Sequence, residues 1–191
     1  MHKIEIAGGK DEKACTALIV LAFSGDPAAR FLYPDADMYL ACFPRFVRAF
    51  GGTAFRTGSA FWIDGASAAL WLPPDAAPEE EKLMALFEET APSGRLEQVL
   101  AIIEEMGGYH PKEPHWYLPL IGTDPSKQGQ GYGSALLRHV TATCDADGLP
   151  AYLEASSPRN VPLYRRHGFE PLGTIQAGES PPITPMLRLP R

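Results

Sequence analysis

Strand-like and helix-like segments alternate through the C-terminal part of the chain, and this alternation limits the possible folds more than any other feature. Apolar runs with strand character are separated by segments whose apolar residues recur at helical spacing. Three strands and two helices fall within about 60 residues, which is typical of an α/β fold. The predicted order is strand 116–123, helix 132–146, strand 151–155, helix 158–166, strand 169–175 and a last strand 183–189.

The N-terminal half mixes both kinds of element. Residues 53–63 and 66–72 predict two strands that form a hairpin, because Asp64-Gly65 between apolar runs favours a tight turn. Two glycine pairs, Gly51-Gly52 and Gly107-Gly108, predict helix ends. A strand is also predicted at 2–7 and helices at 11–23, 35–50, 79–89 and 96–106, with a kink or a break at Pro44.

Size and composition narrow the class of protein. The 191 residues contain no repeat, low-complexity tract or linker, which predicts one domain over 1–191. The net charge of -6 argues against a general nucleic-acid partner, and the arginines in 159–166 form either a local basic patch or a solvated helix face. Without a signal peptide or membrane span, a cytoplasmic location and no membrane partner are expected. The chain has three cysteines, which are far apart in the sequence: Cys15, Cys42 and Cys144. We therefore expect buried reduced thiols, and we expect neither a disulfide framework nor a metal site.

A glycine-rich loop, Gln128-Gly129-Gln130-Gly131-Tyr132-Gly133, lies between a predicted strand and a predicted helix. Glycine allows the backbone to approach a ligand closely, and the N-terminus of a helix favours an anion, so a phosphate or pyrophosphate is the natural occupant. A Walker loop would need a Gly-Lys-Ser/Thr triplet, and a Rossmann loop would need glycine or alanine where Ser134 stands. A purely structural tight turn remains the alternative.

Two motifs resemble those of the GNAT superfamily of N-acetyltransferases. Gln128-x-x-Gly131-x-Gly133 is similar to its acetyl-CoA motif, and residues 163–169 (LYRRHGF) resemble its L-Y-x-x-x-G-F signature at the usual separation. Residues 111–114, 122–125 and 153–160 look like segments of puromycin N-acetyltransferases and their relatives, so the close resemblance covers about 60 residues.

The resemblance implies a fold and an activity. The implied fold is α/β, with a mixed sheet of about six to seven strands, splayed between strands 4 and 5 and flanked by helices. Pro119 fits that splay, with a sheet edge as the alternative. Residues 1–109 would form mainly the acceptor side and 110–175 the acetyl-CoA-binding core. The implied reaction is direct transfer of acetyl from acetyl-CoA, as cosubstrate and without a metal, to a primary amine.

Ten residues are implied to hold acetyl-CoA. The glycine loop would bind the pyrophosphate through backbone N–H groups, and the strand before it would pair with the pantetheine arm. Many relatives carry asparagine seven residues before the tyrosine of the second motif, where this chain has serine, so the nearby asparagine is a second candidate. The residues are Ile121, Thr123, Gln128, Gly129, Gln130, Gly131, Gly133, Ser134, Ser157 and Asn160.

Three residues are candidates for proton transfer. Tyr164 matches the family's usual general acid, with packing against the cofactor as the alternative role. Glu154 is a lone carboxylate in an apolar strand and the first candidate for general base, unless it faces solvent or pairs with an arginine. His115 shares strand parity with Tyr117 and Ile121 and is the second candidate. A water chain is the third.

The residues leave several functional questions open. The acceptor is a puromycin-like aminonucleoside, another small amine, or a peptide or protein amine. A non-catalytic acetyl-CoA-binding module, or an acyltransferase with another donor or acceptor, is the rival interpretation, and a homodimer is possible. Five aromatic residues on predicted strands or nearby, Tyr33, Phe55, Phe61, Trp62 and Trp71, belong either to an acceptor pocket or, in the favoured interpretation, to the core.

Overall fold

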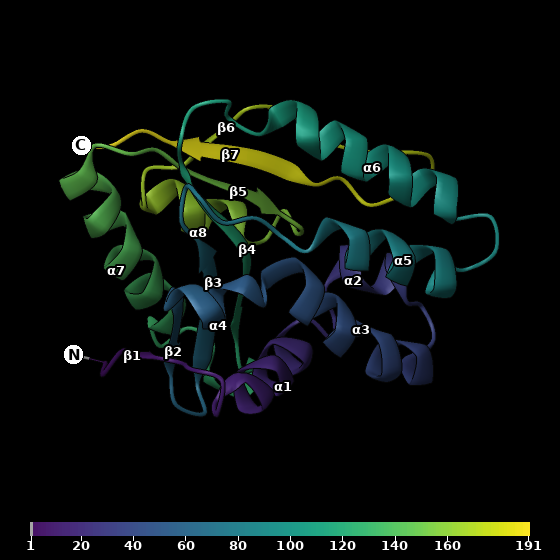
Figure 1. Cartoon of the computed structure of the whole chain (residues 1–191), viewed down its shortest axis with the longest axis horizontal. Helices are drawn as coiled ribbons and strands as arrows, with labels where there is room; N and C mark the ends of the chain where they lie inside the picture. Colours follow the sequence, from purple (N-terminus) through teal and green to yellow (C-terminus); the bar gives the residue numbers. More distant parts are fainter. Residues whose placement is uncertain (1) are drawn as a thin grey trace.

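A seven-stranded mixed sheet runs through the structure, a computed structural model that describes residues 2–191 (Figure 1). Its strand order is β1-β2-β3-β4-β5-β7-β6. Strands β4 and β5 pair in parallel, and the other pairings in the described part of the chain are antiparallel. The strands are β1 (Glu5–Ile6), β2 (Ala60–Ile63), β3 (Ser67–Leu72), β4 (Trp116–Thr123), β5 (Ala151–Ala155), β6 (Glu170–Pro171) and β7 (Thr184–Arg188).

Helices cover both faces of the sheet. In Figure 1, α7 lies on one side of the strands, and α1 and α3 lie with α2, α5 and α6 on the other. The helices are α1 (Glu12–Ala22), α2 (Pro27–Leu32), α3 (Ala36–Gly51), α4 (Thr53–Thr57), α5 (Glu80–Thr90), α6 (Leu96–Tyr109), α7 (Tyr132–Asp147) and α8 (Val161–Arg166), with a short 3-10 turn at Pro125–Lys127.

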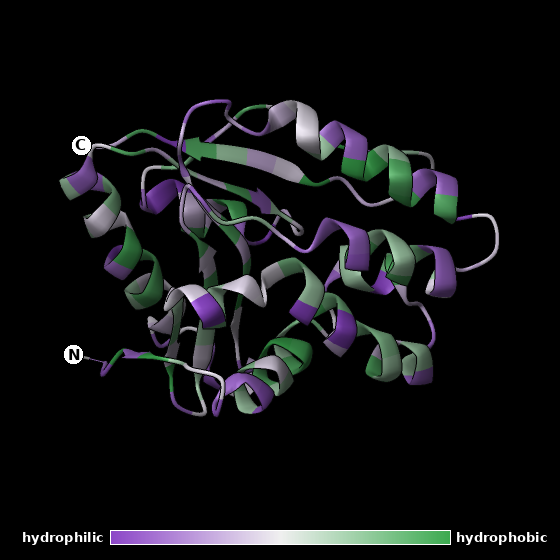
Figure 2. Cartoon of the chain, in the orientation of Figure 1, coloured by the Kyte–Doolittle hydropathy of each residue, from purple (hydrophilic) through white to green (hydrophobic). Residues whose placement is uncertain are grey.

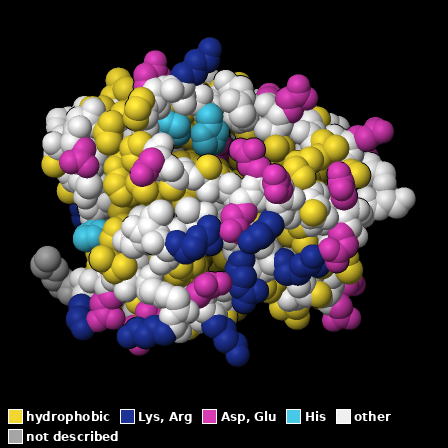
Figure 3. Space-filling model, in the orientation of Figure 1, with side chains coloured by type: hydrophobic (Ala, Val, Ile, Leu, Met, Phe, Trp, Pro, Cys, Tyr) yellow, Lys and Arg dark blue, Asp and Glu magenta, His cyan; other side chains and the backbone are white. Residues whose placement is uncertain are grey.

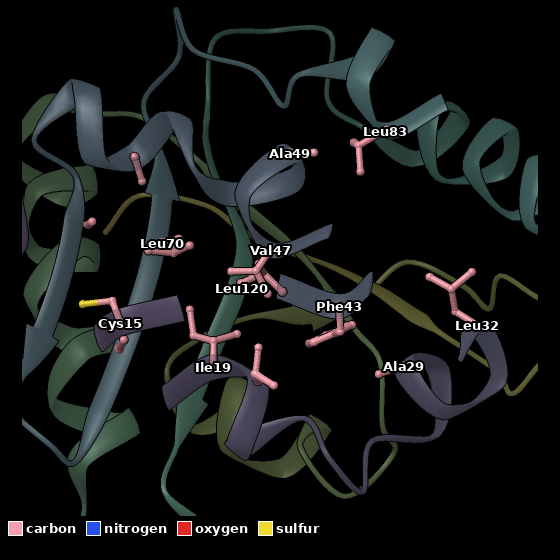
Figure 4. Packing of buried hydrophobic residues seen from close by; sticks show 14 of the residues in the cluster. Cys15, Ile19, Ala29, Leu32, Phe43, Val47, Ala49, Leu70, Leu83 and Leu120 are labelled. Carbon is pink, nitrogen blue, oxygen red and sulfur yellow. The ribbon is translucent and has the colours of Figure 1, made fainter. Parts of the chain in front are cut away.

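Strand β3 shows why the sheet needs a helical layer on each side. All six of its residues are buried, and their side chains alternate between two separate hydrophobic clusters. Leu70 and Leu72 pack with α1 and α3, whereas Ala69 and Trp71 pack with α7. Figure 4 shows part of the first cluster, with Cys15 and Ile19 of α1 below Val47 of α3, Leu70 of β3 and Leu120 of β4. The helices carry apolar residues in patches interrupted by polar ones, as surface helices over a core do (Figure 2).

The sheet splits between β4 and β5. Only Trp116 to Leu118 pair with β5, at Ala151 to Leu153, although β4 continues to Thr123. Pro119 follows the last paired residue, and the pairing of β4 with β3 is also irregular there, with a register shift between Leu70 and Leu72. The proline therefore lies in the splay, as predicted, in a strand at the centre of the sheet and not at its edge.

The prediction of one strand over 53–63 is wrong in its first half. Residues Thr53–Thr57 form the short helix α4, which ends at Gly58 in the left-handed region with φ of 71°. Strand β2 starts only at Ala60. Ala54 and Phe55 are buried in the same core as α1 and α3, so tertiary packing outweighs the strand propensity of this apolar run.

One predicted helix end is also wrong, and of the kink or break predicted at Pro44 the break does not occur. Helix α6 continues through Gly107-Gly108 to Tyr109, since two exposed glycines cost a helix about 1 kcal/mol each without breaking it. Helix α3 passes through Pro44 without a break. The proline leaves the carbonyl of Leu40 without its helical donor, but that residue is exposed and its carbonyl can bind water.

Two further predictions need correction. The helix α2 was not predicted, although Asp26-Pro27 is an N-cap followed by a proline at the first helical position. The predicted strand at 169–175 is short, with β6 limited to two residues and an isolated bridge between Ile175 and Ile183.

No described helix is long and apolar enough to cross a membrane. The three cysteines are free and buried, as predicted.

Candidate active site

A cavity of about 140 Å³ opens where β4 and β5 separate. By the same kind of measure, one water molecule needs about 10–15 Å³, so the cavity has room for a small organic group. Residues Leu118 to Ile121 of β4 line one side. The end of β5, the segment after it and α8 contribute Glu154, Ser156, Asn160 and Tyr164. Helices α2, α3, α5 and α6, with residues 23–26 and 180–183, supply the remaining lining.

Glu154 is a buried carboxylate at this cavity, as the sequence analysis expected of a lone acid in an apolar strand. Its side chain is 5% exposed. Oε2 accepts a hydrogen bond from the Tyr117 hydroxyl at 2.8 Å, and Oε1 lies 3.3 Å from Nε2 of His110. No group in the described part of the chain donates a hydrogen bond of good geometry to Oε1. This oxygen is itself buried, and the His110 ring is the polar group recorded beside it.

Behind Glu154, two histidines and two tyrosines pack together. The ring of His110 lies 4.6 Å from Tyr117, 4.5 Å from Tyr152 and 5.5 Å from His115, measured between centroids. Burial raises the pKa of both tyrosines, and the nearby carboxylate raises it further, so both hydroxyls keep their protons. The side chain of His110 is 30% exposed, so the cluster connects the buried carboxylate to the surface.

Tyr164 reaches the same cavity from the other face of the sheet. It is buried in the cluster that contains α7, whereas Tyr152, which has the same strand parity as Glu154, belongs to the cluster that contains α1 and α3. Burial raises the pKa of Tyr164 and the charge of Asp26 adds to this, so the phenol is protonated at neutral pH. The two candidates for proton transfer can meet only because the sheet is split between them.

Asp26 is a cavity residue that the sequence analysis missed. One of its oxygens accepts from the backbone N–H groups of Ala28 and Ala29 and so caps α2, and the other accepts from the Ser156 hydroxyl at 2.6 Å. Burial raises the pKa of Asp26, and these hydrogen bonds oppose the rise. The local signal was the N-cap followed by a proline, which identifies a helix start but gives no sign of a cavity.

The unpaired part of β4 turns backbone donors toward the gap. The N–H of Asp124 donates to the carbonyl of Ala66 at 2.9 Å, on the β3 side. Because successive N–H groups along a strand point to opposite sides, those of Thr123 and Ile121 point away from β3. No strand within residues 2–191 pairs with β4 there, so these two donors face the space between the separated strands.

The glycine loop forms the N-terminus of α7. Gly129 and Gly131 have φ of 77° and 84°, a region that glycine adopts without strain, and Gly131 is the N-cap residue. The first helical hydrogen bond runs from the N–H of Ala135 to the carbonyl of Gly131. Within the described chain, the backbone N–H groups of residues 129–134 donate to no protein acceptor. The loop thus presents successive free donors at the positive end of a helix, a geometry that suits a phosphate.

A second hollow with basic side chains lies beside the loop. Ser134 Oγ is 2.6 Å from Nε2 of His167 and accepts from Arg138 at 3.0 Å. The hollow is lined by Ser134, Arg138, Thr141, Arg166, His167, Arg188 and Arg191. Of the three arginines noted in the sequence, only Arg166 lines this hollow. On the face shown in Figure 3, acidic and basic side chains are intermingled.

The remaining predicted residues separate into two groups. Asn160 lines the cavity, whereas Ser157 and His115 are absent from its lining among residues 2–191. His115 Nδ1 lies 2.8 Å from the carbonyl of Glu113, and burial lowers its pKa. Gln128 is exposed in the loop. None of the five aromatic residues considered for a pocket lines it: Tyr33, Phe55, Phe61, Trp62 and Trp71 pack in or against the core, the favoured interpretation.

Metal ligands were not expected from the sequence. Among residues 2–191, no group of three or more histidines, cysteines and carboxylates is close enough to hold a metal ion. Two residues that contact Glu154, His110 and Tyr117, were not indicated by any pattern in the sequence. The first follows a helix and the second lies in an ordinary apolar strand, so only the folded chain brings them to Glu154.

The sequence pattern described as "Acetyltransferase (GNAT) family" matches residues 60–169, more than half of the chain. The chain therefore belongs to the GNAT acetyltransferase family, and the resemblance inferred from the two motifs is confirmed. The seven-stranded sheet with its splay between β4 and β5 confirms the predicted fold class.

The comparisons also identify similar individual proteins. An uncharacterised N-acetyltransferase of Schizosaccharomyces pombe is 35% identical over 78 residues, which cover 39% of this chain and 32% of that protein. The chain thus spans about a third of that relative's length. A Corynebacterium glutamicum structure described as histone acetyltransferase HPA2 and related acetyltransferase is 29% identical, with a TM-score of 0.69 over 100% of this chain and 98% of that one.

Two more distant structures share the fold. Drosophila melanogaster polyamine N acetyltransferase is 13% identical with a TM-score of 0.66, covering 99% of this chain and 100% of that one. Mosquito arylalkylamine N-Acetyltransferase like 5b is 12% identical with a TM-score of 0.65 and the same coverage.

The environment of His167 predicts a pH-dependent stability. Burial lowers its pKa, and the positive charges of Arg138, Arg166 and Arg188 lower it further, so the folded protein binds this proton more weakly than the unfolded chain. The free energy of unfolding should therefore fall as the pH drops below the ordinary histidine pKa of about 6.5. In the His167→Gln variant, the free energy of unfolding measured with urea should fall less between pH 7.5 and pH 5.5 than it does in the wild type. The exposed His139→Gln is the control and should behave like wild type; equal losses in all three proteins would contradict the assignment.

Proposed function

We propose that the protein transfers an acetyl group from acetyl-CoA to a primary amine. The proposal rests on one observation, the cavity at the split between β4 and β5, where a buried carboxylate, a buried phenol and the unpaired edge of β4 face the same space. Membership of the GNAT family supports acetyl transfer as the reaction class.

The free backbone donors of residues 129–134 would bind the pyrophosphate of acetyl-CoA. The outward-facing N–H groups of Ile121 and Thr123 would pair with the pantetheine arm, as a further strand would. Asn160 is the better placed of the two proposed side-chain contacts, because it lines the cavity and Ser157 does not. The basic hollow beside Ser134 supports binding of a polyanionic cosubstrate on this side.

The reaction would follow from these positions. Glu154 takes a proton from the acceptor ammonium, and the amine nitrogen attacks the thioester carbonyl carbon. The N–H of Ile121 stabilises the oxyanion that develops on the carbonyl oxygen. The carbon–nitrogen bond forms, the carbon–sulfur bond breaks, and Tyr164 donates its proton to the leaving thiolate. The attacking nitrogen then loses its second proton, which restores the Tyr164 phenol and leaves a neutral amide. The raised pKa of Tyr164 means that the phenol carries its proton when the thioester is attacked.

The histidine cluster offers the proton on Glu154 a route to solvent. His110 Nε2 is 3.3 Å from Oε1 and the ring is partly exposed, so it is the nearest group able to accept the proton. His115, predicted as an alternative base, lies one ring further out and has a lowered pKa, so it stays neutral near pH 7. We assign it to this route and Glu154 to direct contact with the acceptor.

Other features of the proposal rest on the sequence and on likeness. The chain forms one domain, with residues 1–109 mainly on the acceptor side and residues 110–175 forming the acetyl-CoA core. It acts in the cytoplasm on a small-molecule or peptide amine. A homodimer is a possible assembly. The distant structural neighbours named for polyamines and arylalkylamines support small amines as acceptors. The rival functions are a non-catalytic acetyl-CoA-binding module and an acyltransferase with a different donor or acceptor.

Acetyl-CoA binding tests the role of the glycine loop. Calorimetry should give saturable one-site binding, weak or absent for ATP. Gly131→Ala should raise the acetyl-CoA Kd at least about tenfold, because a side chain disfavours the left-handed backbone by about 1–2 kcal/mol and shifts the loop. Gly148→Ala is the matched control, since it places the same strain at the C-terminus of the same helix. Absence of binding to the wild type, or equal affinities of both variants, would overturn the proposed site.

Replacement of Tyr164 by phenylalanine tests the general acid. The phenyl ring keeps the packing and removes only the hydroxyl, so the acetyl-CoA Kd should change less than twofold. Turnover should fall roughly 100-fold, within the range usual for a lost proton-transfer group. Release of CoA measured by a thiol reagent reports turnover. An unchanged rate would make Tyr164 a packing residue.

Glu154→Gln tests the general base. The amide retains the shape and can still accept from Tyr117, but it cannot take a proton. Turnover should fall roughly 100-fold at pH 7 and recover toward wild type as the pH rises toward the pKa of the amine, because free amine then needs no base. A defect of constant size from pH 7 to 9.5 would contradict the assignment and favour a structural role.

A further inference from the structure

The side of the cavity away from β4 is almost entirely hydrocarbon. Helices α3 and α6 and the segments around them supply phenyl rings and branched side chains to its wall. The apolar residues on this side include Phe23, Phe31, Phe43, Phe46, Phe50, Phe87, Val99, Ile102, Ile103 and Met106. An apolar wall of this kind gains most from a ligand group that leaves water when it binds.

A row of aromatic rings leads along α3 to the candidate base. Phe43, Phe46 and Phe50 follow one another at helical spacing, with centroids 5.3 Å and 5.1 Å apart. The ring of Phe50 lies 6.0 Å from Tyr117 in an edge-to-face arrangement, and the Tyr117 hydroxyl donates to Glu154. The apolar wall therefore ends at the carboxylate. A ligand with an apolar body along α3 would bring its polar end to that position.

Charge in the cavity is confined to this one end. Of the described residues that line it, just two carry charged side chains, and both are acidic: Asp26 and Glu154. Asp26 accepts from Ser156, which directly follows the last residue of β5 and is two residues beyond Glu154. The two carboxylates thus lie at the same end of β5. A cationic group is stabilised there and would be left without a partner against the wall of α3 and α6.

We propose that the acceptor is a monoamine whose single ammonium group is attached to an aromatic or branched apolar body. The inference rests on the proposed amine acetylation. The ammonium meets Glu154, with Asp26 adding a second negative charge, and the apolar body lies against the rings of Phe46 and Phe50. A linear polyamine fits poorly, because its second ammonium would enter the apolar part of the cavity unpaired.

Aromatic acceptors have an additional advantage. Rings pack edge-to-face or offset at centroid distances of about 4.5–7 Å, and the rows in this wall already use those distances. A phenyl group on the acceptor extends such a row, whereas a polar sugar or guanidinium loses its water without gaining a partner.

The first test compares acceptors on the wild-type protein. With saturating acetyl-CoA, kcat/KM for 2-phenylethylamine and for 3-methylbutylamine should exceed that for spermidine and agmatine by at least about 100-fold. If kcat/KM for spermidine or agmatine equals that for 2-phenylethylamine, the proposed acceptor class is wrong, whereas the proposed function still stands. If acetyl-CoA binds but none of these amines nor a peptide amine is acetylated, the proposed function fails and the inference fails with it.

A variant of the wall gives an independent readout. Phe46→Ala should raise KM for 2-phenylethylamine at least about tenfold with kcat changed less than twofold, and should leave KM for ethylamine unchanged. Phe61→Ala on β2 is the matched control, since that ring packs against His139 and does not line the cavity. If Phe46→Ala fails to fold, Phe46→Leu keeps the core filled and should produce a smaller shift of the same kind. Equal KM values for 2-phenylethylamine in the Phe46 and Phe61 variants would overturn the proposal.

Discussion

The separation of β4 from β5 decides where every other part of the candidate site lies, because it is the one place where the centre of the sheet leaves a strand unpaired. Three residue pairs hold the strands together, and Pro119 then interrupts the ladder, since it has no N–H to donate. Beyond it, the backbone N–H groups of Ile121 and Thr123 face an open gap. A bound molecule that supplies acceptors to this edge takes the position of the missing strand, which is how an extended ligand arm and a sheet can recognise each other without a dedicated side chain for every contact.

The same gap joins two chemical environments that a complete sheet would keep apart. Glu154 belongs to the side covered by α1 and α3, and Tyr164 to the side covered by α7. Both side chains are buried, and each lines the shared cavity. The proposed base and the proposed acid therefore line one cavity without contacting each other, so that neither neutralises the other in the resting protein. Two carboxylates, Asp26 and Glu154, line this cavity, whereas the free backbone N–H groups of residues 129–134 lie outside its lining.

The sequence was informative where local chemistry determines structure. The helical and strand periods of residues 116–166 predicted β4, α7 and β5 closely, and the glycine pattern predicted the loop before α7, because special backbone conformations require that residue. It failed where tertiary packing decides: residues 53–57 form a helix against the core, and α6 runs through two glycines. Glu154 and Tyr164 were found through strand pattern and motif. Asp26, His110 and Tyr117 were not, since they come from separate segments and acquire a common role only when the chain folds.

Asp26 both begins a helix and lines the cavity, so these two properties cannot vary independently. Its carboxylate holds the first turn of the six-residue α2 in place and simultaneously bonds to Ser156 at the end of β5. Any cation that draws charge from this carboxylate weakens its hydrogen bonds to the helix, and any loosening of the helix moves the carboxylate away from the cation. Binding of a cation at this carboxylate would therefore be thermodynamically linked to order in α2.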